Sequence, residues 1–196
     1  MVERRLAHRF GVSHAPIREA LLLLAHEGFL VSQTNRGAQV APFLSAPLRR
    51  FFMALRTALE TFALRSSDRR FSEADLLAIE RLLRDFNLAR EKHDPGAMAL
   101  HHYAFHEAIV SHCDQHDVIS AWRAVIARAR LYTVEWVSLD NQQPFSDEHE
   151  RIIAACRNQD IHHAQQSLDN ALRIEAGAMA AAGSSEQFDA ADQLKD

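Results

Sequence analysis

The sequence of 196 residues has little cysteine and no long apolar run. Its two cysteines, Cys113 and Cys156, form no Cys-x-x-Cys pair, and both fall on apolar helical patterns, so we interpret them as core or surface thiols without a chemical role. No uncharged apolar stretch approaches the roughly 20 residues that span a bilayer. The chain opens on charged residues rather than on an apolar signal segment. These absences predict a cytoplasmic globular protein that makes no membrane contact.

The chain also lacks an overall basic excess. It holds 22 basic and 26 acidic side chains, a net charge of −4, which taken alone argues against a nucleic-acid partner. The charge is nevertheless uneven, because residues 1–42 carry five arginines against three glutamates, a net of +2. The remaining residues carry 17 basic and 23 acidic side chains, a net of −6. This division favours a small DNA-binding module attached to a larger, acidic domain.

The first 40 residues contain the pattern of a winged helix-turn-helix. Residues 3–10 form an amphipathic helical pattern that stops at Gly11, a residue able to take the left-handed conformation at a helix C-terminus. Pro16 opens a second helical pattern, which ends before Gly28. The apolar period then changes from about 3.6 to about 2, and Asn35-Arg36-Gly37 is typical of a hairpin turn. Helix, helix and hairpin follow in the order of a winged helix.

No strand pattern follows this module, so the fold class that we predict is mainly α, with a small hairpin wing followed by a six-helix bundle. Several helix starts are marked chemically, by a capping box at Ser72, by Asp94-Pro95, and by Asp117 and Asp160. The six helices are predicted at roughly 46–67, 72–92, 95–113, 117–137, 147–157 and 160–182. The predicted domains are a DNA-binding domain at 1–42, a linker at 43–47, a helical effector-binding and dimerisation domain at 48–182, and a flexible tail at 183–196.

The residues of the first module closely resemble the winged helix of the GntR family of bacterial regulators. The matching elements are Leu6-Ala7, the turn Gly11-Val-Ser13, the run Pro16-Ile-Arg-Glu-Ala-Leu21, Glu27-Gly28 and Arg36-Gly37. The helical part, with Arg56-Thr-Ala-Leu-Glu60, Phe105-His106 and Glu148-His149, looks like the effector domain of the FadR subfamily. The resemblance covers residues 2 to about 182. It implies a metabolite-responsive transcription regulator that binds double-stranded operator DNA as a homodimer, whose two recognition helices address two half-sites.

The resemblance also implies which residues contact DNA. Arg18 lies one turn into the recognition helix, where its guanidinium can bind a guanine edge or a phosphate. Ser13 lies beside a helix N-terminus that can bind phosphate. Taken singly, such arginines are usually only a solvated face. The implied DNA contacts are Arg4, Ser13, His14, Arg18, Asn35, Arg36 and Gly37.

Two departures from the family pattern bear on DNA binding. His14 and Ala15 stand where many members have arginine and threonine, so we expect a different set of contacts and a different operator. The family also has a further helix and an extended segment before Glu3. We therefore expect a DNA-binding module without its first helix, with part of its apolar surface uncovered.

Histidines suggest a metal site in the helical part. His102 and His106 are four residues apart, which places them on one helix face. In the resembled effector domain an aspartate, two histidines and a last-helix histidine hold a divalent metal. Those positions map onto His102, His106, His149 and Ala171. Three of the four are histidines, and Ala171, which has no ligand atom, has Asn170 as its neighbour. Three imidazoles with open positions suit Zn²⁺ or Ni²⁺. The alternative is a cavity without metal, as in some relatives.

The same resemblance implies that a small organic acid binds in the helical domain and changes operator affinity. Arg56 is a candidate anchor for its carboxylate, because a guanidinium matches two oxygens, and Asn170 is a second candidate contact. The alternative for Arg56 is a surface partner for Glu60, one turn on.

The sequence leaves two alternative functions. A protein deficient in DNA binding that only dimerises and binds an effector is one. A metal-dependent hydrolase with Glu107 or Glu148 as base is the other. The hydrolase is disfavoured because the sequence has neither a nucleophile motif nor a phosphate loop, and we expect the protein not to be an enzyme.

Overall fold

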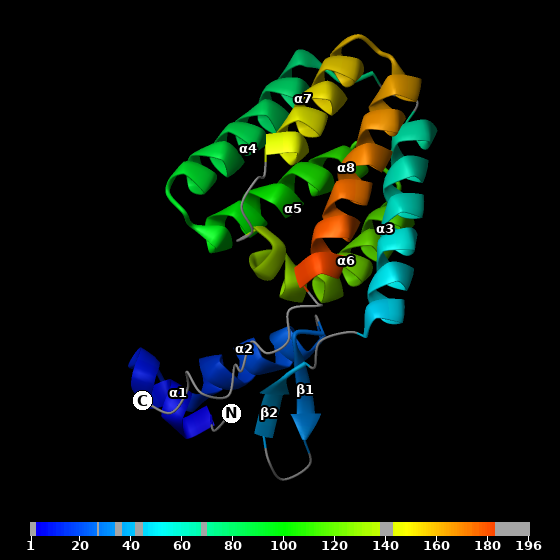
Figure 1. Ribbon diagram of the computed structural model, residues 1–196. Coiled ribbons are helices and arrows are strands. Elements are labelled where there is room, and N and C mark those ends of the chain that lie inside the picture. Colours follow the sequence, from blue (N-terminus) through cyan, green and yellow to red (C-terminus); the bar gives the residue numbers. More distant parts are fainter. Residues whose placement is uncertain are drawn as a thin grey trace. The chain divides into compact units, whose positions relative to one another are not determined.

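The computed structural model describes residues 3–26, 28–33, 37–41, 45–67, 70–137 and 143–182. Within these ranges it contains eight helices and two strands (Figure 1). The mainly α fold with one small hairpin is therefore confirmed. The elements are α1 (Glu3–Phe10), α2 (His14–His26), β1 (Leu30–Gln33), β2 (Gly37–Val40), α3 (Ala46–Ser66), α4 (Glu73–Glu91), α5 (Pro95–Ser111), α6 (His116–Val137), α7 (Gln143–Arg157) and α8 (Ile161–Ala182).

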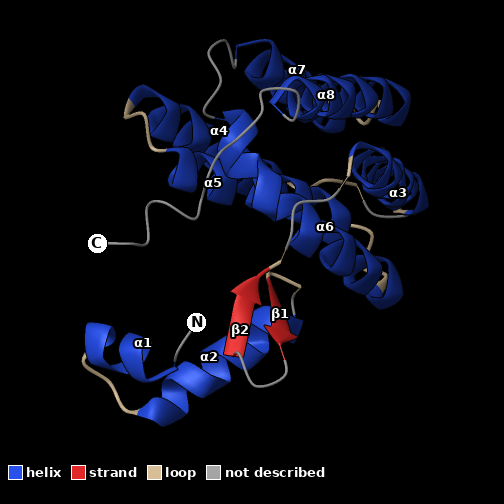
Figure 2. Ribbon diagram, turned by 60° about the horizontal axis from the view of Figure 1, so that its bottom comes forward, coloured by secondary structure: helices blue, strands red, loops and turns tan. Residues whose placement is uncertain are grey.

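The first four elements form the expected winged helix-turn-helix. Gly11 ends α1 with a φ of 64°, and the amide of Val12 donates to the carbonyl of Ala7 over 3.1 Å, so the glycine closes the helix as predicted. After α2, Gly28 has a φ of 82° and turns the chain into β1. Strands β1 and β2 pair antiparallel, with Leu30 opposite Val40, and β1 also contacts α2 (Figure 2).

The starts of α4, α5 and α8 agree with the sequence patterns and are capped by side chains. The Ser72 hydroxyl accepts from the amide of Asp75, whose carboxylate accepts from the amide of Ser72, which is the predicted capping box. Asp94 accepts from the amide of Ala97, and Asp160 from that of His163. These bonds satisfy amide groups that the first turn of a helix leaves without partners.

Two helices begin two or more residues earlier than predicted. Helix α7 starts at Gln143 rather than at 147, and Pro144 is its second residue. The backbone amides of the first helical turn have no partner within the helix, so a proline there costs no hydrogen bond. Pro144 therefore marks the start of α7 in the sequence. Helix α2 likewise starts at His14, two residues before Pro16.

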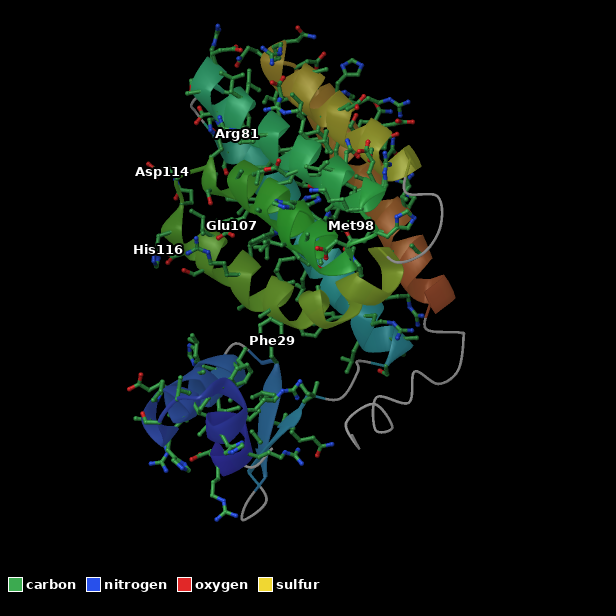
Figure 3. The ribbon with its side chains drawn as sticks, turned by 90° about the vertical axis from the view of Figure 1, so that its left-hand side faces the viewer. Phe29, Arg81, Met98, Glu107, Asp114 and His116 are labelled. Atoms are coloured by element: carbon green, nitrogen blue, oxygen red, sulfur yellow. The ribbon has the colours of Figure 1, made fainter. Side chains whose placement is uncertain are left out.

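The chain divides into two compact units, Met1–Arg70 with Tyr103–Tyr132, and Phe71–His102 with Thr133–Asp196. Helix α5 therefore contributes to both. In the first unit, α3, α5 and α6 share a core around Trp122, which is fully buried. Its members are Ala63, Tyr103, Val110, Cys113, Trp122, Ile126 and Ala129. The turn that joins α5 to α6 carries Asp114, with a φ of 54°, and lies near Glu107 and His116 (Figure 3).

In the second unit α7 packs against both α4 and α8, as Figure 1 shows. The rings of Phe86 on α4 and Phe145 on α7 lie 5.4 Å apart between centroids, and both side chains are buried. Leu168 and Leu172 on α8 complete this core. The buried faces of α4, α7 and α8 thus follow the helical spacing of their apolar residues.

Cys113 and Cys156 are both buried and both free thiols, so the structure places them in the core. Burial raises the pKa of the Cys156 thiol to about 12, which keeps it protonated and unreactive at neutral pH. Among the described residues, no helix combines the length and apolar character needed to cross a membrane.

Candidate functional site

The three histidines singled out in the sequence lie together. His102 and His106 occupy one face of α5, and His149 lies on α7. All three side chains are buried, and one ring nitrogen of each lies within 4.8 Å of the others. A group of imidazoles at this spacing can hold a divalent metal ion.

Two of these histidines have fixed tautomers that suit metal binding. Nδ1 of His106 lies 2.8 Å from Oε2 of Glu60, and Nδ1 of His149 lies 2.7 Å from the carbonyl oxygen of Phe145. A carbonyl oxygen and an ionised carboxylate can only accept, so each Nδ1 must carry the proton and donate it. Each Nε2 is then left with a lone pair. Metal-ligating histidines nearly always have such a partner on their other nitrogen, so the residues present fit a metal.

The third histidine has a different neighbour. Nε2 of His102 lies 3.3 Å from Oε2 of Glu175 on α8, and both side chains are buried. Phe145 packs against two of the histidines, since its ring centroid is 4.9 Å from that of His102 and 4.0 Å from that of His149. Aromatic walls of this kind exclude water, which strengthens electrostatic interactions among the buried groups.

Glu60 is the centre of a buried polar cluster in the first unit. Its Oε1 accepts from Nε of Arg56 over 2.7 Å and from Nε1 of Trp122 over 2.7 Å, while Oε2 accepts from His106. Burial works to raise the pKa of Glu60, but the charge of Arg56 and the hydrogen bonds from His106 and Arg56 outweigh it and hold that pKa well below its usual range. Glu60 therefore stays ionised and orients the ring of His106.

The interpretation of Arg56 as a surface partner for Glu60 is wrong in one respect. The two side chains do pair, but both are fully buried. The sequence pattern misled because an i, i+4 pair of opposite charges is typical of a solvated helix face. Here the guanidinium carbon lies 5.5 Å above the ring of Tyr103. The role of Arg56 as an effector anchor stays a prediction.

Ala171, at the position of the missing ligand, and its neighbour Asn170 differ in burial. Ala171 is fully buried, whereas Asn170 is half-buried, and its Oδ1 accepts from Arg173 over a long 3.4 Å. A methyl side chain cannot bind a metal, so Ala171 leaves that ligand position empty. The contact of Asn170 with an effector likewise stays a prediction.

Sequence reasoning missed Glu175 and Trp122, and it read Glu60 only as a partner of Arg56. A signal was available, because both glutamates fall on apolar helical stripes. Glu175 continues the stripe of Leu168, Ala171 and Leu172, and all four are buried. An acidic residue at a core position of a helix is unusual and requires a compensating partner.

The two carboxylates considered as hydrolytic bases are both paired with arginines. Glu107 accepts from Nε of Arg123 over 2.7 Å, and Glu148 accepts from Arg151. Neither belongs to the three-histidine group. The hydrolase interpretation therefore gains nothing from the geometry.

The residues expected to contact DNA lie at the surface of the winged helix wherever the structure describes them. Arg4 on α1, Ser13 just before α2 and His14 at its start are exposed. Arg18 on α2 is also exposed and pairs with Glu3 over 3.4 Å. A surface pair of this kind contributes at most about 1 kcal/mol, so DNA can displace it. Gly37 begins β2 opposite Gln33, and Asn35 and Arg36 lie outside the described residues.

Two family models match this arrangement. The model for bacterial regulatory proteins of the gntR family matches residues 1–40, and the FCD domain model matches residues 52–173. The chain belongs to the GntR family, with an FCD domain. The FCD domain is consistent with the FadR subfamily, and members of the GntR family bind operator DNA, typically as dimers.

Curated relatives agree with this assignment. The chain is 28% identical over 188 residues to the Nta operon transcriptional regulator of Aminobacter aminovorans, covering 90% of this chain and 86% of that one. It is 28% identical over 173 residues to the HTH-type transcriptional repressor GlaR of Escherichia coli K12, covering 83% and 78%. This GntR-family protein is therefore a DNA-binding transcription regulator with a metabolite-binding FCD domain.

Solved structures share the fold. E. coli McbR/YncC matches with a TM-score of 0.80 at 20% identity, over 92% of this chain and 86% of that one. A GntR regulator from Rhodococcus sp. RHA1 matches with a TM-score of 0.77 at 19% identity, over the same shares. At such identities the likeness concerns the fold alone.

Proposed function

We propose that this regulator binds a small organic acid at the three-histidine group, and that binding changes its affinity for operator DNA. The observation that carries the proposal is the buried set His102, His106 and His149, whose ring nitrogens lie within 4.8 Å of one another. Buried polar groups that converge on one point are typical of a ligand site. The protein then acts by binding rather than by catalysis.

The donor set suits Zn²⁺ or Ni²⁺. His106 and His149 would use Nε2, because their Nδ1 atoms donate to Glu60 and to the carbonyl of Phe145. When bound, the metal supplies a Lewis-acidic position that accepts a carboxylate oxygen. Arg56 and Asn170 are the proposed further contacts, and Arg56 would use guanidinium nitrogens other than the Nε that bonds Glu60.

On the DNA side, a homodimer would present two copies of α2 to two half-sites about one helical turn apart. Arg4, Ser13, His14 and Arg18 are exposed, and Arg18 would exchange its pair with Glu3 for a contact with the duplex. For effector binding to act on the operator, the effector must bind the two arrangements of the dimer with different affinity.

The experiment combines two titrations on one preparation. Calorimetry with the Zn²⁺-loaded protein identifies organic acids that bind. Fluorescence anisotropy then measures affinity for an operator fragment, selected from random sequence by the protein itself, with and without each acid. We expect at least one acid that binds to change operator affinity about 5- to 150-fold.

His102→Ala should lose the response to the acid and retain binding to the operator, whereas His101→Ala, at the neighbouring position on α5, should retain both. If every acid that binds leaves operator affinity unchanged, the coupling is refuted. If the acids bind His102→Ala as tightly as wild type, the effector lies elsewhere.

A further inference from the structure

We propose that Glu175 is the fourth protein ligand of the metal, and that it replaces the ligand missing at Ala171. The proposal rests on the metal site of the proposed function and extends it to a residue on α8. Glu175 follows Ala171 by four residues, so the two share one face of α8. Both side chains are completely buried.

The distance between Glu175 and His102 is the first support. Oε2 of the glutamate lies 3.3 Å from Nε2 of the histidine. Two ligand atoms that each lie about 2.0–2.2 Å from one zinc ion, at tetrahedral or right angles, are about 2.8–3.6 Å apart. This separation is one that neighbouring ligands on one ion can have, and Glu175 would move closer to His106 and His149 to join their group.

Charge is the second support. Three neutral imidazoles leave the two positive charges of a divalent ion uncompensated in a buried place, which is costly in free energy. The carboxylate of Glu175 would halve this excess. Glu60, the other buried carboxylate, lies beside His106 and is held there by hydrogen bonds from Arg56, Trp122 and His106.

The donor atoms indicate which class of metal ion the site would bind. Three imidazoles and one carboxylate suit Zn²⁺, Ni²⁺, Co²⁺ and related divalent ions, and disfavour ions that prefer thiolates. The rival role for Glu175 is an outer one, in which it only accepts a hydrogen bond from His102 and orients that ring. The test must separate these two roles.

The first measurement uses Zn²⁺ and Co²⁺ as probes on the full chain. Glu175→Gln should weaken Zn²⁺ binding by more than the roughly 10- to 100-fold that loss of an outer partner costs. It should also change the visible absorption of bound Co²⁺, because that absorption depends on the ligands themselves. Asp169→Asn, a matched loss of one carboxylate on α8, should change neither.

An unchanged Co²⁺ spectrum in Glu175→Gln would overturn the proposal, with or without weaker binding, because the ligands would then be the same. The second measurement needs no substitution and decides the matter if Glu175→Gln does not fold. In a crystal structure of Zn²⁺-loaded wild type, a carboxylate oxygen of Glu175 should lie about 2.0–2.2 Å from the ion. A water between them would overturn the proposal.

Failure of the underlying site gives a different result. If wild type binds neither Zn²⁺ nor Co²⁺, the metal site of the proposed function is absent, and the role of Glu175 falls with it. If wild type binds metal through the three histidines while Glu175 stays outside the ligand sphere, only the present inference fails.

Discussion

The two sets of candidate functional residues in this regulator differ most in their contact with water. Arg4, Ser13, His14 and Arg18 of the winged helix are exposed. The histidines of the FCD domain, and the carboxylates Glu60 and Glu175 beside them, are buried. Exposed residues can change at little cost to the fold, whereas buried charged residues contribute to stability and function together. Substitutions in the buried set should therefore change stability more than substitutions in the exposed set.

The largest effect should come from the buried ion pair. Arg56→Ala leaves the carboxylate of Glu60 without its cation, so we expect a loss of about 3–5 kcal/mol in the free energy of unfolding. Arg18→Ala removes only an exposed pair with Glu3, and its effect should stay within about 0.5 kcal/mol. Urea denaturation measures both. Equal losses of stability in Arg56→Ala and Arg18→Ala would contradict the difference between buried and exposed charged residues.

The second effect concerns metal content. Protein purified without a nickel column should contain Zn or Ni at near-stoichiometric level by elemental analysis, and His102→Ala or His149→Ala should abolish it. Removal by chelator should lower the melting temperature, because a ligand at about 100 times its Kd stabilises the folded state by about 2.7 kcal/mol. His101→Ala is the matched control. Metal-free wild type with a melting temperature indifferent to chelator would refute the site.

The third effect concerns DNA alone. Arg18→Ala should weaken operator binding by about 10- to 100-fold, the cost of one lost base or phosphate contact, without changing the urea midpoint. Arg81→Ala, which removes an exposed arginine from α4, should leave both quantities unchanged. Fluorescence anisotropy with the selected operator fragment provides the measurement. Wild-type affinity in Arg18→Ala would remove this residue from the DNA surface.

The smallest effect should come from the start of α8. The amide and then the ring of His163 lower the pKa of Asp160 below its ordinary 3.8. A lowered pKa means that the ionised form stabilises the fold above the ordinary value, and that this contribution is lost as pH falls through the folded value. Wild type should therefore lose its stability difference from Asp160→Asn as the pH falls below the ordinary pKa of 3.8 and through the lower pKa of the folded state. A difference independent of pH would contradict the assignment.

Much of the fold was predictable because local chemistry encodes it. Gly11, the Ser72 capping box and Asp94 mark helix ends through bonds among neighbouring residues, and each was found as predicted. The start of α7 was missed because Pro144 was not read as a first-turn proline. Boundaries of this kind depend on a few residues, so a sequence contains most of the information.

The candidate site was predictable only in part. Spacing placed His102 and His106 on one face of α5, and the family resemblance added His149. Neither could show that Arg56 and Glu60 are buried, because the same i, i+4 pair suits a solvated face. Burial depends on which helix face the rest of the chain covers.

By itself, the sequence determined the family, the winged helix and the positions of most helices, because each of these depends on patterns among residues that are close together along the chain. Only the tertiary structure decided that Glu175 lies beside His102 and that Glu60 joins Arg56, His106 and Trp122. Apart from Arg56 and Glu60, which are four residues apart on α3, those residues are far apart along the chain, and packing alone brings their side chains to within hydrogen-bonding distance. The burial of Ala171 and of Glu175, one turn further along α8, likewise became known only from the packing.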